Sequence, residues 1–173
     1  LAMAFDREAG SMKVLMTAPI SRRQLLIFKL LSAAAVSTIQ SYLMLAIALL
    51  VGVNIPLDGM LAALPVIFMA AYALALIGLL LASTVSGMEN FAGVMNFVIF
   101  PALFLSSSLY PLWQLEESSE LLFWISSLNP FTYLVESVRF ALYLQFQPFV
   151  LGGILLGVIL MSYLAPFAYK PNP

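Results

Sequence analysis

Four long stretches without a charged side chain are the feature that most constrains how this chain folds. They cover residues 30–57, 59–88, 90–115 and 140–169 and hold 28, 30, 26 and 30 residues. An α-helix needs roughly 20 apolar residues to cross the hydrocarbon core of a bilayer. Each stretch therefore has room for one crossing, and none has room for two. The sequence predicts four transmembrane helices, at 26–53, 60–82, 91–112 and 149–168.

Composition supports lipid as the solvent for most of the chain. Only 9% of its 173 residues are charged, 63% are hydrophobic, and the mean hydropathy is +1.05. About 25% of the residues of a soluble domain are charged, because its surface faces water. Open sheet edges cannot be satisfied in lipid, so strands are not expected. The predicted fold class is an all-α integral membrane protein, a helical bundle that forms a single transmembrane domain over 1–173.

Several function classes are disfavoured by missing residues and motifs. The chain has no cysteine and no histidine, which removes thiolate chemistry, the commonest metal ligand and the usual base at neutral pH. It has no Gly-x4-Gly-Lys-Ser/Thr loop for ATP and no Gly-x-Ser-x-Gly elbow. A membrane-embedded enzyme is therefore the less favoured interpretation, and no cofactor or metal site is expected. No basic stripe follows the first thirty residues, so nucleic acid is not an expected partner.

The basic residues predict the orientation of the chain. Six of the seven lie before the first predicted crossing, in its first turn or after the last crossing, and these are Arg7, Lys13, Arg22, Arg23, Lys29 and Lys170. Basic residues favour the cytoplasmic side, and an even number of crossings puts both ends on one side. We expect cytoplasmic termini and an outer location for 113–148.

The first 24 residues are predicted to form a surface helix followed by a sharp turn, the elbow, that leads into a membrane helix. Apolar residues recur at three- or four-residue spacing from Phe5 to Met16, which predicts a short amphipathic helix at the cytoplasmic interface. Pro19 ends this helix. Ser21 then starts the next one, with Gln24 three residues later to complete a capping box.

The segment 113–148 is too polar for a simple crossing and too apolar for a solvated loop. Its helical pieces are separated by Asn129–Pro130, and we expect short helices at 116–128 and 131–145 in an interfacial or re-entrant hairpin. Glu136 and Arg139 are spaced to form an ion pair.

Other polar and small residues leave alternatives open. Two series spaced by four favour close helix packing, within the bundle or between protomers: Ala33, Ser37 and Ser41, and Gly153 and Gly157. Three further residues could line a translocation path or could hydrogen-bond a neighbouring helix, namely Gln40, Tyr72 and Asn96.

Two blocks of sequence resemble the ABC-2 type transporter permeases. The elbow resembles the cytoplasmic segment of these permeases at Glu8, Gly10, Ser11, Leu15, Thr17, Pro19, Ser21 and Lys29. The outer part is similar to their second signature at Phe104, Leu105, Ser106, Tyr110, Pro111, Asn129, Pro130, Thr132, Tyr133 and Arg139. Ser11 stands where these permeases usually have Thr, and Lys13 where an acidic residue is common.

The resemblance implies a permease subunit of an ABC exporter in the bacterial inner membrane. Its expected partners are a separate ATPase subunit that uses the ATP, a second permease protomer in a homo- or heterodimer, and membrane lipid. The surface helix would be the coupling helix that docks on the ATPase, through Phe5, Arg7, Glu8, Gly10, Met12, Leu15, Thr17, Pro19 and Ser21. These permeases usually have six crossings, so a chain that begins at Leu1 with four is expected to be a fragment.

Two other interpretations remain open. The opening segment fits a plain membrane anchor, in which Arg22, Arg23 and Lys29 meet anionic lipid. A non-transporting anchor or assembly subunit fits the hydropathy equally well.

Overall fold

In the computed structural model, the described residues are 21–84, 90 and 93–168. These ranges contain helices and short connections and no strand, so the all-α prediction is confirmed. In chain order the helices are α3 (Arg22–Leu50), α4 (Leu57–Thr84), the π-helix η1 (Met95–Ile99), α6 (Phe100–Phe104), α7 (Leu112–Ser118), α8 (Glu120–Leu128), α9 (Pro130–Leu142) and α10 (Pro148–Ala168).

Three of these helices, α3, α4 and α10, are long and apolar enough to cross a membrane. The candidate spans are Arg23–Leu50, Leu57–Ser83 and Pro148–Ala165. Their outward faces carry exposed large apolar side chains such as Leu43 and Leu61. A water-facing bundle would bury such side chains, whereas a lipid-facing bundle has no reason to. The helices overlap the predicted crossings at 26–53, 60–82 and 149–168.

The predicted crossing at 91–112 differs from the structure, in which the helix ends at Phe104. Over the described residues it runs from 93 to 104 and includes the π-helical turn η1 just before Pro101. Among the described residues, this stretch is not one of the helices long and apolar enough to cross a membrane. The chain then leaves the helix, and in the turn that follows Ser106 and Ser108 both donate hydroxyl hydrogen bonds to the Leu103 carbonyl. The count of four crossings is therefore not confirmed.

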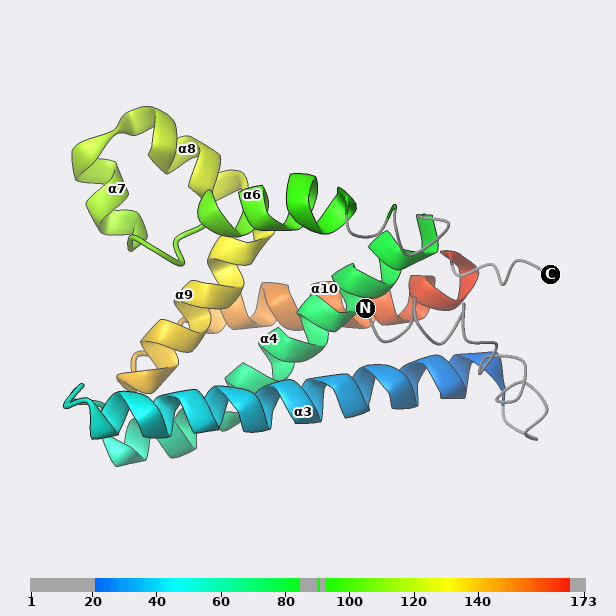
Figure 1. Ribbon diagram of the computed structural model, residues 1–173, viewed down its shortest axis with the longest axis horizontal. Helices are drawn as coiled ribbons and strands as arrows, with labels where there is room; N and C mark the ends of the chain where they lie inside the picture. Colours follow the sequence, from blue (N-terminus) through cyan, green and yellow to red (C-terminus); the bar gives the residue numbers. More distant parts are fainter. Residues whose placement is uncertain (1–20, 85–89, 91–92, 169–173) are drawn as a thin grey trace.

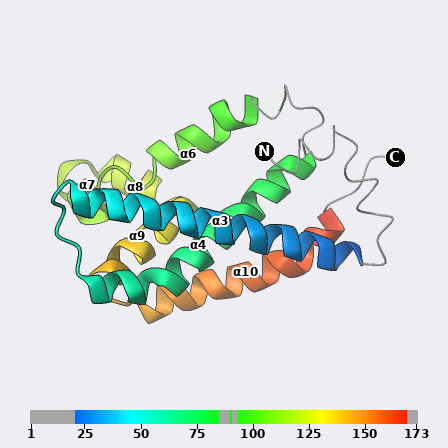
Figure 2. The same cartoon turned by 60° about the horizontal axis from the view of Figure 1, so that its bottom comes forward.

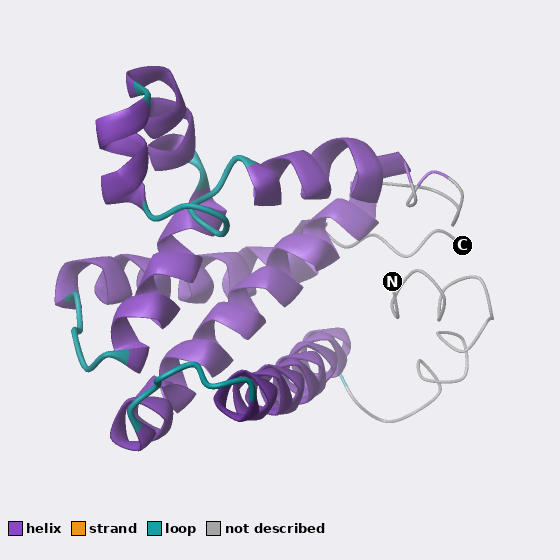
Figure 3. Cartoon of the chain, turned by 60° about the vertical axis from the view of Figure 1, so that its left-hand side comes forward, coloured by secondary structure: helices purple, strands orange, loops and turns teal. Residues whose placement is uncertain are grey.

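Helix α4 is the central element, since it packs against α3, α9 and α10. The start of α3 and the ends of α4 and α10 lie together at one end of the bundle (Figures 1 and 2). The short helices α7 and α8 lie toward the other end. Figure 3 shows that short loops join the helices throughout the described chain.

Both ends of α3 are set by local sequence. Ser21 accepts a hydrogen bond from the Gln24 N–H (3.3 Å), and the Gln24 side chain accepts one from the Ser21 N–H (3.1 Å). The predicted capping box is thereby confirmed. At the other end Gly52 has a φ of 91°, and Val53 N–H bonds the Ala48 carbonyl at 3.0 Å. This is a Schellman ending, in which glycine takes the left-handed position at least cost.

The segment 113–148 contains the expected break and one more. Asn129 is extended (φ −84°, ψ 121°) and separates α8 from α9, as predicted. Ser119 is also extended and separates α7 from α8, so the first expected helix is two shorter ones. A single extended residue without a Gly or Pro signal cannot be read from the sequence.

Helix α9 packs against α4 inside the bundle. Ala141 near its end lies against Ala63, and Leu134 near its start lies against Ala70 and Ala73, half-way along α4. Its 13 residues rise about 20 Å, too short to cross a bilayer. Apolar packing thus draws α9 alongside the long helices.

Candidate functional site

The two halves of the second sequence motif meet in space. Ser107, in the turn between α6 and α7, donates its N–H to the Thr132 hydroxyl at 3.3 Å. Its own hydroxyl donates to the Thr132 carbonyl at 3.4 Å. Both side chains are fully buried, so these bonds are sheltered from competing water. The turn is thereby fixed against the first turn of α9.

A charged pair lies on the same face of α9, one and two turns further along. Arg139 Nη1 is 2.7 Å from Glu136 Oε1, so the predicted ion pair is confirmed. Arg139 Nη2 donates to the Ser107 carbonyl at 2.8 Å, and Glu136 accepts the Leu112 N–H at 3.3 Å. Glu136 is 7% exposed. The pair therefore holds the turn that joins α6 to α7 at Ser107 and the start of α7 at Leu112.

Asn129 and Tyr133 add ties on either side. The Asn129 side-chain oxygen Oδ1 caps α9 by accepting the Phe131 N–H at 3.0 Å, and the side-chain amide donates through Nδ2 to the Ala102 carbonyl in α6. Tyr133 donates its hydroxyl to the Ser127 carbonyl at 2.7 Å. Pro130 is the first residue of α9, where its missing N–H costs nothing.

We call Ser107, Asn129, Thr132, Glu136 and Arg139 the polar network. Every buried side-chain nitrogen and oxygen in the described part of the chain has a partner. A fully satisfied network in a low dielectric is rigid, because each bond strengthens its neighbours. What this arrangement can do is hold α6, the following turn, α8 and α9 in one geometry.

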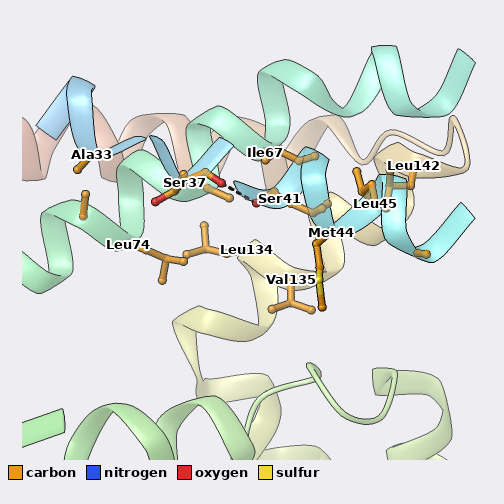
Figure 4. A pocket seen from close by; sticks show the side chains of 15 residues that line it. Ala33, Ser37, Ser41, Met44, Leu45, Ile67, Leu74, Leu134, Val135 and Leu142 are labelled. Atoms are coloured by element: carbon orange, nitrogen blue, oxygen red, sulfur yellow. Dashed lines mark hydrogen bonds between the residues drawn. The ribbon is translucent and has the colours of Figure 1, made fainter. Parts of the chain in front are cut away.

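A groove of about 750 Å³ lies between α3, α4 and α9. Ala33, Ser37 and Ser41 line its α3 side, and Leu134 and Val135 of α9 face them (Figure 4). Ser41 donates its hydroxyl to the Ser37 carbonyl at 2.9 Å, which leaves the lining largely apolar. The small residues of α3 therefore face this groove.

The second series of small residues also lines a groove. Gly153 and Gly157 border a hollow of about 450 Å³ between α4, α9 and α10. A methyl group built on either glycine would meet nothing within 4 Å. Close packing of these glycines within the described bundle is therefore not seen.

The other residues singled out from the sequence differ in whether the structure describes them and in how exposed they are. The coupling residues from Phe5 to Pro19 lie outside the described residues, and Ser21 alone of that set is described. Gln40 and Asn96 are exposed, whereas Tyr72 is buried and accepts a hydrogen bond from Ser162 at 3.3 Å.

Sequence reasoning missed Ser107. The motif had singled out its neighbour Ser106, because three consecutive serines give no sign of which one faces a partner. The register follows from how the turn packs against α9, and no local pattern encodes that packing.

Comparison with known proteins identifies the family. The ABC-2 type transporter family profile matches residues 1–143. A relative from Porphyra purpurea, named a transport permease (ycf38), is 29% identical over 143 residues, which cover 81% of this chain and 48% of the relative. The multidrug ABC transporter permease YbhR of Escherichia coli K12, named as probable, is 33% identical over 141 residues, 80% of this chain and 38% of the relative.

No solved structure matches the chain significantly. The chain spans about half the length, or less, of the curated relatives it matches. The profile match nevertheless covers both motif blocks, from the opening segment to the end of α9. On this ground the chain belongs to the ABC-2 type transporter family.

Proposed function

We propose that the chain is part of the membrane-spanning permease of an ABC exporter, which forms the translocation path and is driven by a separate ATPase subunit. Family membership supports the permease role, and the relative named multidrug permease suggests small-molecule cargo. The protein would lie in the bacterial inner membrane with both ends of this chain in the cytoplasm. A second permease protomer would complete the path.

In this proposal the chain crosses the membrane four times, through α3, α4, the stretch that ends at Phe104, and α10. The segment between Phe104 and α10 would be re-entrant, because α9 begins level with the middle of α4, ends nearer the start of α4 and is too short to cross. The polar network would fix this re-entrant part.

The observation that best supports the coupling role is how α3 begins. The capping box at Ser21 joins the opening segment directly to a helix of 29 residues, about 43 Å long. A displacement of residues 1–20 would act on one end of a stiff rod and tilt it within the bundle. The coupling helix would be Phe5 to Met16, and Pro19 with Ser21 would form the elbow.

Two sets of variants in the full-length protein, purified with its ATPase, test this role. Reversing the charge of Arg7 or Glu8 should release the ATPase, because like charges would face each other across the contact. Changing Pro19 and Ser21 together to Gly should leave the ATPase bound but should uncouple ATP hydrolysis from transport, since the elbow loses its fixed φ and its cap.

The readouts are co-purification of the ATPase and ATP-driven uptake of a fluorescent drug into inverted vesicles. Reversing the charge of Glu116, which is exposed on α7, is the matched control and should change neither. A non-transporting anchor would tolerate both sets of variants. Full transport and a normally bound ATPase in both sets would end the coupling proposal.

A further inference from the structure

Three helices converge at the end of the bundle where α3 begins. Leu26 and Leu30 of α3, Leu76 of α4 and Ala165 of α10 form one buried cluster, to which Ala34, Tyr72 and Leu79 also belong. Figures 1 and 2 both place the start of α3 beside the end of α10. This cluster lies within the first turns of the helix that follows the opening segment.

Two polar contacts lie over the cluster. The guanidinium of Arg23 lies over the ring of Tyr163, 5.5 Å from its centroid, which is a cation–π contact between α3 and α10. One residue earlier on α10, the Ser162 hydroxyl donates to the Tyr72 hydroxyl of α4 at 3.3 Å. Arg23 is two residues after the capping Ser21, so its contact is made at the point where the elbow ends.

Helix α10 extends from this end of the bundle to α9, the helix that carries most of the polar network. Ile154 and Val158 of α10 pack with Leu134 and Val138 of α9 and with two alanines of α4. On α9, Leu134 and Val138 lie within two positions of Thr132, Glu136 and Arg139, the residues that hold the turn after α6. A movement of α10 would therefore reach α9 through close-packed apolar side chains.

We infer that Arg23 and Tyr163 are positioning residues that make α10 follow α3 when the opening segment is displaced. This inference rests on the proposed coupling function and adds a second helix to it. The packed cluster resists separation of the helices, whereas the cation–π contact resists sliding of one past the other, because the cation must stay over the ring face.

The test measures helix movement in the full-length permease with its bound ATPase. Nitroxide labels are placed on cysteines introduced into this cysteine-free chain at exposed positions: Leu50 of α3, Leu61 of α4 and Phe149 of α10. The Leu50–Leu61 pair reports α3, and the Phe149–Leu61 pair reports α10. Spin–spin distances are compared without nucleotide and after trapping with ATP and vanadate, where helix shifts of about 1–2 Å or more are expected.

Without further substitution, both pairs should change distance on trapping. Tyr163→Leu and Arg23→Gln should each abolish the change of the α10 pair and keep the change of the α3 pair. Tyr163→Phe keeps an aromatic face and Arg23→Lys keeps a cation, so both should retain the α10 change. Both side chains are exposed, so none of these substitutions removes a core contact.

The outcomes separate the two proposals. If neither pair changes distance in the otherwise unsubstituted protein, the coupling function fails and this inference fails with it. If both pairs change and Tyr163→Leu and Arg23→Gln still move α10, only the present inference is overturned. Loss of the bound ATPase in these variants would also overturn it, because the residues would then belong to the docking surface.

Discussion

At the scale of single residues, Gly59 shows how closely the backbones approach in this bundle. It is buried in the first turns of α4, opposite the end of α9. A β-carbon at this position would lie 1.8 Å from the Leu142 carbonyl oxygen and 2.8 Å from the Leu142 carbonyl carbon. The obstacle is backbone and cannot rotate away, so only glycine permits this contact.

Replacing Gly59 with Ala should therefore separate α4 from α9. We expect the free energy of unfolding to fall by about 1–3 kcal/mol, the usual cost of overpacking a tight contact. Thermal unfolding of the purified protein in detergent measures the effect.

Gly78 offers a matched control in the same helix, because a β-carbon there would meet nothing within 4 Å. Gly78→Ala should leave stability unchanged or raise it by up to about 1 kcal/mol, through the better helix propensity of alanine. Equal effects at the two positions would contradict the close approach seen at Gly59.

At the scale of elements, the polar network holds together pieces that have little apolar packing of their own. Helix α6 has no buried residue, yet its end is tied to α8 and α9 through Asn129, Ser126 and Ser107. Buried polar groups cost free energy unless they are paired, so the network favours one arrangement over looser ones. Directional bonds thus take the place of a hydrophobic core in this region.

Removing one partner of the charged pair should be more harmful than removing both. Arg139→Ala leaves Glu136 buried and unpaired, and we expect a loss of about 3–5 kcal/mol in the free energy of unfolding. A double variant, Glu136→Leu with Arg139→Leu, should recover much of that loss, because no charge remains buried. Equilibrium unfolding in detergent or bicelles gives the numbers.

Glu116 on α7 provides the comparison for this prediction. Its side chain is exposed, so Glu116→Gln should change the free energy of unfolding by less than about 0.5 kcal/mol. An Arg139→Ala protein as stable as Glu116→Gln would show that the network does not hold the segment in place.

At the scale of the whole molecule, the arrangement of the bundle agrees with the charge pattern. The start of α3 and the end of α10 lie at one end, and Arg23 and Lys29 are at that end too. Helices α7 and α8, which carry Glu116, Glu117 and Glu120, lie toward the other end. The positive-inside rule predicts that the first end faces the cytoplasm, as in the proposed function.

Cysteine labelling in intact cells tests this orientation. Single cysteines in place of Asn54, in the turn after α3, and Ser119, between α7 and α8, should react from outside with an impermeant thiol reagent. A cysteine in place of Ser11 should react only after the membrane is opened, because its segment is expected in the cytoplasm. Labelling of position 11 from outside, with positions 54 and 119 protected, would reverse the topology.

The sequence by itself determined the features that depend on local chemistry. Long uncharged stretches predicted the three long helices, since the length and apolarity of a span are set residue by residue. The capping box at Ser21, the break at Asn129–Pro130 and the Glu136–Arg139 pair also follow from short-range contacts. The ABC-2 resemblance came from the same kind of information, namely residue types at fixed spacing.

Only the tertiary structure decided how the outer segment folds back. Three contacts show this: Ser107 rather than Ser106 bonds Thr132, α9 reaches the middle of α4, and Arg23 lies over Tyr163. Each contact joins residues at least 25 positions apart in the sequence. Such contacts depend on the packing of whole helices, and hydropathy in a membrane protein is nearly uniform around each helix. An apolar pattern without a polar face cannot specify which face meets which neighbour, so that choice falls to side-chain shape and to the few buried polar groups.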